Sequence, residues 1–253
     1  MSATAPILAT HDLGLDIGGA HIVADVSLEV GAGEFVGIIG PNGAGKTTLF
    51  NLLSGLMAPT AGRVELRGRD VTHAAPFRRT RLGLGRTFQV SSVFPLLAAE
   101  ENVRLAAEAA QGGSMRIWRF ARGVAAARER ADWALDRVGL GAKAGWPAGL
   151  LSHGDQRKLE LAMLLAADPE VILLDEPMAG VSAEDVADLQ TLIGSVHTND
   201  GKTVLMVEHR MEVVIGLAQK IAVMHHGALL AFDEPAAVMA NETVQTAYLG
   251  EPL

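Results

Sequence analysis

The segment GPNGAGKTT at positions 40–48 has the residue types and spacing of a phosphate-binding loop. Gly40, Gly45, Lys46 and Thr47 occupy the fixed positions of the pattern G-x-x-x-x-G-K-[ST]. The glycines let backbone N–H groups approach a phosphate chain, and the helix that follows points its positive dipole end at the same anion. Lys46 would reach the β and γ phosphates, and the Thr47 hydroxyl would complete a magnesium shell. A chance glycine turn is the alternative, but the apolar run before the segment and the helix pattern after it favour a phosphate site.

Two acidic residues end a second apolar run, VILLDEP at 171–177. Asp175 lies where a buried strand delivers side chains to a ligand crevice, and there it would hold the metal shell. Glu176 would point elsewhere, because side chains alternate along a strand, so it could activate a water molecule. The alternative is a capped strand end with two solvated acids, which is less favoured beside a phosphate loop.

His209 ends the run TVLMVEH at 203–209 in the same way. Because both runs end in polar residues, His209 and Asp175 are predicted to face one crevice. There His209 would hydrogen-bond the γ-phosphate, or hold the attacking water and Glu176 in place. A lone histidine is more often structural, and that alternative stays open at this point.

The segment LSHGDQRKLELAM at 151–163 predicts a helix with an unusual first turn. Ser152 can cap it, with Asp155 as capping-box partner. Gly154 lies inside the first turn, where glycine costs about 1 kcal/mol, and a bare glycine there would let another group approach closely. The serine hydroxyl, the N–H groups and the helix dipole would form a second anion site. A chain with two such sites can sandwich a nucleotide between two copies; the simpler alternative is a well-capped helix.

The rest of the chain supplies the elements that must position these residues. Continuous apolar runs at 33–40, 171–177 and 203–209 predict buried parallel strands. The alternating N-terminal stretch predicts antiparallel strands, and 221–232 predicts a hairpin that turns at His226 and Gly227. Helices are predicted at 46–55, 95–110, 121–138, 153–166, 183–197 and 211–218.

These elements predict one α/β domain over residues 1–253, with a phosphate-loop core and an antiparallel β edge at its N-terminus. The core would comprise residues 1–89 and 166–253, and a helical subdomain at 90–165 would be inserted into it.

Composition excludes several classes of function. With 49% hydrophobic and 20% charged residues, the 253-residue chain is not a disordered tail. The absence of cysteine rules out a disulfide scaffold or a thiol nucleophile. The net charge of -8 argues against non-specific nucleic-acid binding through bulk charge, while a local basic patch stays open; the arginines at 63–86 are interpreted as a solvated face. No run approaches the ~20 apolar residues of a spanning helix, and the N-terminus has no secretory signal pattern, so any link to a membrane would go through a partner.

Taken together, the segments resemble the ATP-binding subunit of an ABC transporter, and more narrowly the ATPases of branched-chain (hydrophobic) amino acid uptake systems. The matching segments, in the family's order, are IGPNGAGKTTLFNLLSG (Walker A), GRTFQ (Q-loop), LSHGDQ (signature), VILLDEP (Walker B), AGVS at 179–182 (D-loop) and VEH (switch). The ending TAYLGE at 246–251 extends the resemblance over nearly the whole chain.

The resemblance implies that two ATPase subunits meet head to tail around ATP and Mg²⁺. The nucleotide residues of one subunit would be Gly40, Pro41, Asn42, Gly43, Ala44, Gly45, Lys46, Thr47 and Thr48. Ser152 and Gly154 of the other subunit would cover the γ-phosphate. Thr47, Gln89 and Asp175 would serve the metal, while Glu176, His209 and Gln89 would serve hydrolysis.

The resemblance also supplies the partners. The second ATPase subunit would be an identical copy or a paralogue, and a groove near Gln89–Phe94 would receive a helix of a multi-spanning permease. A solute-binding protein would act indirectly, and the chain would lie on the cytoplasmic face of the inner membrane. A urea or short-amide importer and a soluble ABC ATPase of DNA repair or translation are the alternatives. A switch GTPase is disfavoured, because the sequence has no N-K-x-D motif.

Three departures from the family pattern stand out. Ile17 occupies the position where the family often stacks an aromatic ring on adenine, a loss of about 0.5–1.5 kcal/mol. His153 and Asp155 alter the signature, and Arg210 follows the switch histidine in place of an acidic residue. The basic cluster Arg116–Arg130 is expected near lipid headgroups or the permease.

Overall fold

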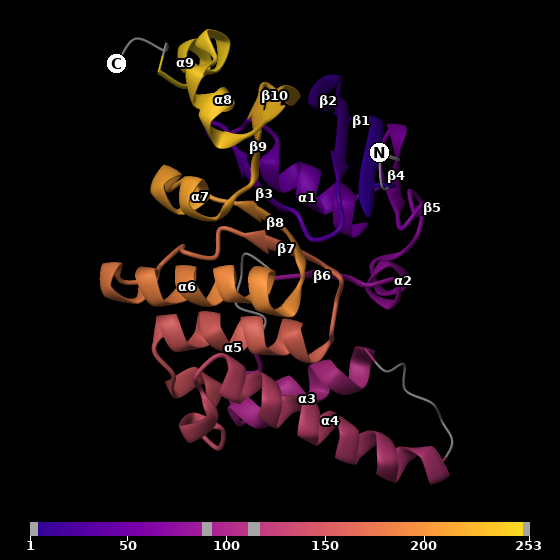
Figure 1. Cartoon of the computed structure of the whole chain (residues 1–253). Coiled ribbons are helices and arrows are strands. Elements are labelled where there is room, and N and C mark those ends of the chain that lie inside the picture. Colours follow the sequence, from indigo (N-terminus) through magenta and orange to yellow (C-terminus); the bar gives the residue numbers. More distant parts are fainter. Residues whose placement is uncertain (1–4, 88–92, 111–116, 250–253) are drawn as a thin grey trace. The chain divides into compact units, whose positions relative to one another are not determined.

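The computed structural model describes residues 5–87, 93–110 and 117–249, which fold into two compact units (Figure 1). The first unit comprises Met1–Leu84, Val171–Glu176 and Gly194–Leu253, and the second comprises Gly85–Glu170 and Pro177–Ile193. Gln89, Arg116 and the end of the TAYLGE segment lie outside the described residues. Within the described ranges, no helix is both long and apolar enough to cross a bilayer.

A four-stranded antiparallel sheet forms the N-terminal part of the first unit, in the order β2-β1-β4-β5. Its strands are β1 (Leu8–Ile17), β2 (Ala20–Val30), β4 (Ala61–Leu66) and β5 (Arg69–Asp70). Alternating apolar side chains such as Val26, Leu28 and Val30 turn into the core. The predicted antiparallel edge is therefore confirmed.

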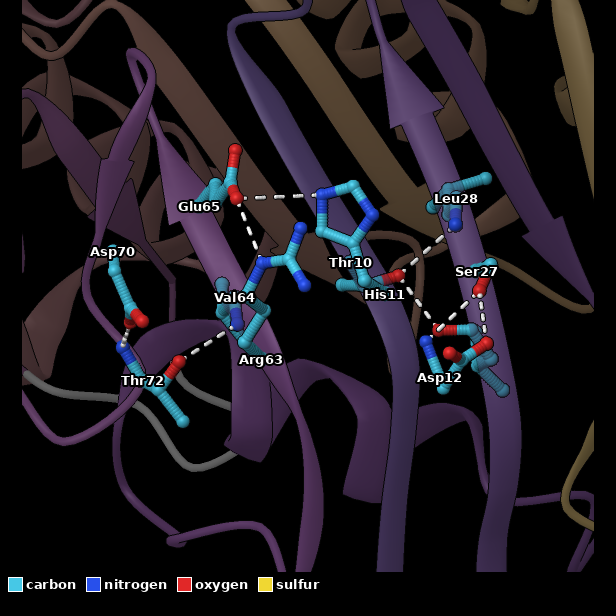
Figure 2. Close-up of polar contacts among 11 residues, drawn as sticks. Thr10, His11, Asp12, Ser27, Leu28, Arg63, Val64, Glu65, Asp70 and Thr72 are labelled. Atoms are coloured by element: carbon cyan, nitrogen blue, oxygen red, sulfur yellow. Dashed lines mark hydrogen bonds and ion pairs between the residues drawn. The ribbon is translucent and has the colours of Figure 1, made fainter.

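Side-chain hydrogen bonds fix the irregular register between β1 and β2 (Figure 2). The buried Thr10 hydroxyl accepts the Leu28 N–H at 3.0 Å and donates to the Val26 carbonyl at 2.9 Å. The Ser27 hydroxyl accepts the N–H of Asp12, which has a left-handed backbone with φ of 46°. The register shifts between Thr10 and Leu13, so these hydroxyls replace the strand-to-strand bonds that a bulge removes.

A six-stranded sheet, in the order β10-β9-β3-β8-β7-β6, carries the ends from which the site is built. Its strands are β3 (Phe35–Ile39), β6 (Leu84–Arg86), β7 (Val171–Asp175), β8 (Thr203–Val207), β9 (Lys220–His225) and β10 (Ala228–Asp233). Every residue of β3, β7 and β8 is buried, and these strands are parallel to one another along the order β3-β8-β7. Both the buried parallel strands and the hairpin β9–β10 agree with the sequence predictions.

In the first unit, helix α1 follows β3 after the glycine loop at 40–45. The helices are α1 (Lys46–Ser54), α2 (Pro76–Arg81), α7 (Met211–Leu217), α8 (Pro235–Ala240) and α9 (Glu242–Leu249). Arg79 of α2 is only 1% exposed and lies against the C-terminal end of α1. Its guanidinium donates to the carbonyls of Leu52, Leu53, Thr72 and Ala74. Burial lowers the pKa of Arg79 to about 10, opposed by the charge of Asp70. A buried cation thus satisfies carbonyls that the helix end leaves without helical partners.

Helices α3 (Ala99–Ala110), α4 (Ile117–Arg137) and α5 (His153–Ala166) pack against one another in the second unit. Short 3₁₀ turns cover Gly141–Lys143 and Ala148–Leu150, and α6 (Ala183–Asp200) begins in this unit. In α4 the buried residues Ala127, Ala131 and Ala134 share one face at helical spacing. The predicted helix ranges agree with these elements to within a few residues.

Candidate functional site

The loop between β3 and α1 is shaped by glycines whose backbone positions leave no room for a side chain. A Cβ atom on Gly40 would lie 2.2 Å from the Met224 carbonyl oxygen. One on Gly45, where φ is 94°, would lie 2.7 Å from the Ile22 carbonyl oxygen. Gly45 also caps the N-terminus of α1, so the backbone turns directly from the loop into the helix. The backbone of β2 and β9 therefore requires glycine at both positions.

Lys46 is 6% exposed, and its ammonium group is held by the loop itself. The Nζ atom donates to the carbonyl of Gly40 at 2.6 Å and to that of Pro41 at 2.9 Å. Burial lowers the pKa of Lys46, while the charges of Glu176 and Asp175 oppose this shift. A cation is thus fixed beside the phosphate loop and faces two carboxylates.

The parallel register of β7 and β8 places the acidic residues next to this cation. Asp175 pairs with Val207 and is 2% exposed at the end of β7. Glu176 donates its N–H to the Val207 carbonyl at 2.9 Å, but its φ is 49°. From the sequence we expect strand alternation to point the Asp175 and Glu176 side chains in different directions. In the structure the strand ends at Asp175, and the left-handed backbone of Glu176 sets the direction of its side chain instead. For a non-glycine residue such a backbone stores about 1–3 kcal/mol of strain, and strain of this kind clusters at functional sites.

His209 meets Glu176 directly. The Nε2 atom of the histidine lies 2.9 Å from the Oε1 atom of the glutamate. One of the arrangements expected from the sequence has His209 holding Glu176, and the structure contains that contact. The side chains are 42% and 23% exposed, so the pair is open to water on one side.

A single cavity of about 350 Å³ collects these groups within the first unit. It is lined by Ile22, Asn42, Gly43, Ala44, Gly45, Lys46, Thr47, Thr48, Glu176 and His209. All except Ile22 were predicted as site residues. The structure therefore brings the loop, the catalytic candidate Glu176 and His209 to one place, with Asp175 buried at the neighbouring strand end.

Ser152 and Gly154 belong to the second unit, at the N-terminus of α5. The Ser152 hydroxyl accepts the N–H of Asp155 at 3.1 Å, which confirms the predicted N-cap. The Asp155 carboxylate bonds Lys143 instead of turning back to the cap. A Cβ atom on Gly154 would lie 2.9 Å from the Oδ2 atom of Asp185, so the group that approaches this glycine is a carboxylate at the start of α6.

Two supporting residues were not anticipated from the sequence. The turn glycine Gly227 donates its N–H to the carbonyl of Ala44 in the phosphate loop at 3.1 Å. Glu208, which precedes His209, is 3% exposed and accepts the His209 N–H at 2.9 Å. A charged residue at the end of a buried strand is the signal that could have drawn attention to Glu208, as it did to Asp175.

Three of the residues that depart from the family pattern are exposed, while Asp155 is partly buried and pairs with Lys143. Ile17 is 52% exposed at the end of β1, while Ile22 lines the cavity. His153 and Arg210 are also exposed. Within the part of the chain that the structure describes, no contact of the Ile17, His153 or Arg210 side chain explains its substitution.

The donor set suits a magnesium nucleotide. The Thr47 hydroxyl and the Asp175 carboxylate would supply oxygen ligands of the kind Mg²⁺ prefers. Among the described residues no group of three or more His, Cys, Asp or Glu side chains could hold a metal ion. The remaining ligands would then be phosphate oxygens and water, which is the usual arrangement for Mg²⁺.

A buried strand, a glycine loop, a helix with a buried lysine and carboxylates at the end of another parallel strand of the same sheet define a P-loop nucleotide-binding protein. Comparison with known proteins places it further. Residues 23–179 match the ABC transporter family, and the chain belongs to that family.

Similar proteins agree with this assignment. The branched-chain amino acid transport ATP-binding protein LivG of Salmonella typhimurium is 38% identical over 252 residues, which is 97% of this chain and 98% of LivG. BraF of Pseudomonas aeruginosa, of the same description, is 37% identical over 251 residues, 97% of this chain and 98% of BraF. A solved ATP-binding cassette of an ABC transporter in its ADP conformation has 28% identity and a TM-score of 0.84, covering 98% of this chain and 100% of that one.

Proposed function

We propose that this chain is the ATP-hydrolysing subunit of an ABC importer for branched-chain or other hydrophobic amino acids. The observation that carries the proposal is the contact between Glu176 and His209 beside the phosphate loop, in a chain that is similar over nearly its full length to transport ATPases of that description. A urea or short-amide importer is less well supported, since LivG and BraF both carry the branched-chain description.

In the proposed reaction, the loop N–H groups and Lys46 bind the phosphates of ATP. Thr47 and Asp175 would hold Mg²⁺, together with Gln89, and the ion would neutralise charge on the phosphates. Glu176 would orient the attacking water and accept its proton as the water oxygen bonds to the γ-phosphorus. The bond between that phosphorus and the oxygen bridging to the β-phosphate breaks in the same displacement, which releases ADP and inorganic phosphate. His209 would keep the Glu176 carboxylate in place and contact the γ-phosphate.

A second ATPase subunit, identical or paralogous, would complete the site. Ser152 at the capped start of α5 would cover the γ-phosphate bound by the partner subunit, with Gly154 beside it. Ser152→Arg tests this arrangement, because a bulky cation there would block the contact while each subunit still binds ATP. We expect the variant to bind ATP normally, to remain monomeric with it and to hydrolyse it poorly; normal dimer formation would contradict the arrangement.

An exposed apolar surface in the second unit is a candidate for contact with a membrane permease. Phe94 is 54% exposed, Leu96 91%, Trp146 51% and Leu150 73%. The two segments that carry them are joined by a backbone bridge between Ala98 and Pro147. Exposed apolar clusters of this kind mark interaction sites.

One buried amide holds the segment of this surface that carries Phe94 and Leu96. Asn102 is 0% exposed; its side chain accepts the Phe94 N–H and donates to the carbonyls of Phe94, Leu97 and Ala98. We propose that a permease helix docks here, close in sequence to Gln89. Leu96→Asp with Leu150→Asp should abolish co-purification with the permease while ATP binding persists. Leu56→Asp is the matched control, because Leu56 is also exposed (47%) but belongs to the first unit.

The importer function itself is tested by uptake. A strain lacking this chain should fail to take up labelled leucine, isoleucine or valine, and the wild-type gene should restore uptake while the Glu176→Gln variant should not. Urea uptake in the same strain distinguishes the alternative solute. Fractionation should find the chain on the cytoplasmic side of the inner membrane only when the permease is present.

A further inference from the structure

Glu208 is a buried carboxylate directly behind the proposed switch histidine. It follows β8 and is 3% exposed, although it carries a charged group. Its backbone N–H donates to the Ile38 carbonyl at 3.4 Å, so its main chain is tied to β3. Removing a carboxylate from water is costly unless hydrogen bonds compensate. A buried glutamate at this position therefore needs an explanation.

The compensation comes from the backbone of the residues that follow. The Oε2 atom of Glu208 accepts the N–H of His209 at 2.9 Å and that of Arg210 at 3.3 Å. Hydrogen bonds from neutral donors to a charged acceptor are among the stronger ones in proteins. The carboxylate therefore fixes the backbone at the point where the chain turns from β8 into α7.

The same turn determines where the imidazole points. Arg210, the N-cap of α7, makes no side-chain capping bond, and its own N–H is one of the two that the Glu208 carboxylate accepts. The Glu208 carboxylate fixes the His209 backbone, and the Nε2 atom of His209 lies 2.9 Å from the Oε1 atom of Glu176. An imidazole on a freely turning loop would lose that contact to water, because the His209 side chain is 42% exposed.

We propose that Glu208 is a positioning residue for hydrolysis: its carboxylate orients His209 and, through it, Glu176. This inference rests on the proposed roles of His209 and Glu176. It assigns Glu208 no contact with nucleotide, so its loss should affect turnover and leave ATP binding nearly unchanged.

A double-mutant cycle separates positioning from general support of the fold. We expect E208A to lower kcat about tenfold, the scale of losing hydrogen bonds to a charged group, with KM for ATP within about twofold. In an H209A background, measured by single-turnover phosphate release, E208A should cause less than about a twofold further loss. Glu212→Ala is the matched control, because Glu212 is an exposed glutamate in the first turn of α7. We expect the kcat of this variant to equal that of the wild type.

The cycle also distinguishes the possible failures. If H209A hydrolyses ATP at the wild-type rate, the proposed role of His209 is wrong. If H209A is impaired but E208A retains full kcat, only the positioning role is overturned. The same conclusion follows if E208A lowers the rate of the H209A protein by the same factor as it lowers the rate of the wild type. A raised KM with unchanged kcat overturns it as well.

A second variant covers the case in which E208A does not fold, as judged by thermal unfolding. E208Q keeps an accepting oxygen and a similar volume but removes the charge. We expect a smaller loss of kcat, about threefold, that is again absent in the H209A background. An equal loss in both backgrounds contradicts the inference.

Discussion

The Nε2 atom of His209 lies 2.9 Å from the Oε1 atom of Glu176, although the residues are 33 positions apart in the chain. The contact follows from the sheet. Because β7 and β8 are parallel, with Asp175 opposite Val207, Glu176 and His209 both follow their strands at the same end of the sheet. The phosphate loop leaves β3, the next strand along, at that end. Adjacent parallel strands thus deliver a cation, a carboxylate and an imidazole to one cavity.

Replacement of Glu176 by glutamine should separate binding from hydrolysis. The amide keeps the side-chain volume but cannot accept the proton of the attacking water. We expect ATP affinity close to that of the wild type and hydrolysis at least about a hundredfold slower. Equilibrium binding and phosphate release measure the two quantities. Glu184→Gln, an exposed glutamate at the start of α6, is the control and should change neither, and near-normal turnover by E176Q would exclude Glu176 as the base.

Replacement of Lys46 by alanine should abolish nucleotide binding. Its buried ammonium is the cation of the cavity, and the loop carbonyls of Gly40 and Pro41 already hold it in position. ATP should raise the melting temperature of the wild type by mass action but leave that of K46A unchanged. Lys202→Ala, outside the cavity lining, should retain the ATP-induced rise. A full rise in K46A would contradict the assigned role.

Much of this site could be predicted because it depends on short-range signals. The fully apolar runs ending at Asp175 and before Glu208 are typical of parallel strands, and the edge at which parallel strands end is fixed by topology. The glycine pattern predicts the phosphate loop because the local backbone geometry restricts which residue types can occupy those positions. Helical periodicity likewise predicts α4, whose buried alanines share one face.

The remainder depends on contacts between segments that are distant in sequence. Nothing in the sequence around Gly154 reveals that the Asp185 carboxylate comes to within 2.9 Å of a Cβ placed there. The bond from Gly227 to Ala44 likewise requires that the β9–β10 turn lie against the loop. Strand alternation does not set the direction of the Glu176 side chain, because β7 ends at Asp175 and Glu176 itself has a left-handed backbone. The role of Gln89 stays a prediction.

Replacement of Gly227 by alanine should weaken ATP binding from outside the cavity. A Cβ atom there would lie 2.8 Å from the Ile22 carbonyl oxygen, so the turn must move and its bond to Ala44 must lengthen. Gly201→Ala is a matched control: its φ of 64° is also positive, but a Cβ atom there would meet nothing within 4 Å. Both variants should lose about 1 kcal/mol of stability from backbone strain, and only G227A should bind ATP less tightly. Equal ATP affinities would show that the turn does not support the loop.

Glu34 should make stability depend on pH in the acidic range. Burial on its own would raise the pKa of this carboxyl group, but the hydrogen bond from Lys220, the Gly31 N–H and the charge of Lys220 outweigh it and lower the pKa below the ordinary 4.5. A lowered pKa means that the unfolded chain binds the proton more readily. The stabilisation is therefore present above pH 4.5 and is lost as the pH falls through the value in the folded protein.

Urea unfolding of the wild type and E34Q at several pH values measures this contribution. We expect E34Q to be less stable at pH 7 by no more than about 1 kcal/mol, because both side chains of the pair are partly exposed and water screens their attraction. The difference should shrink as the pH falls below 4.5. Glu29→Gln, an exposed glutamate of β2, should show little difference at any pH. A difference between wild type and E34Q that stays constant down to the acid limit would mean that volume or packing, and not the ionised carboxylate, is what Glu34 contributes.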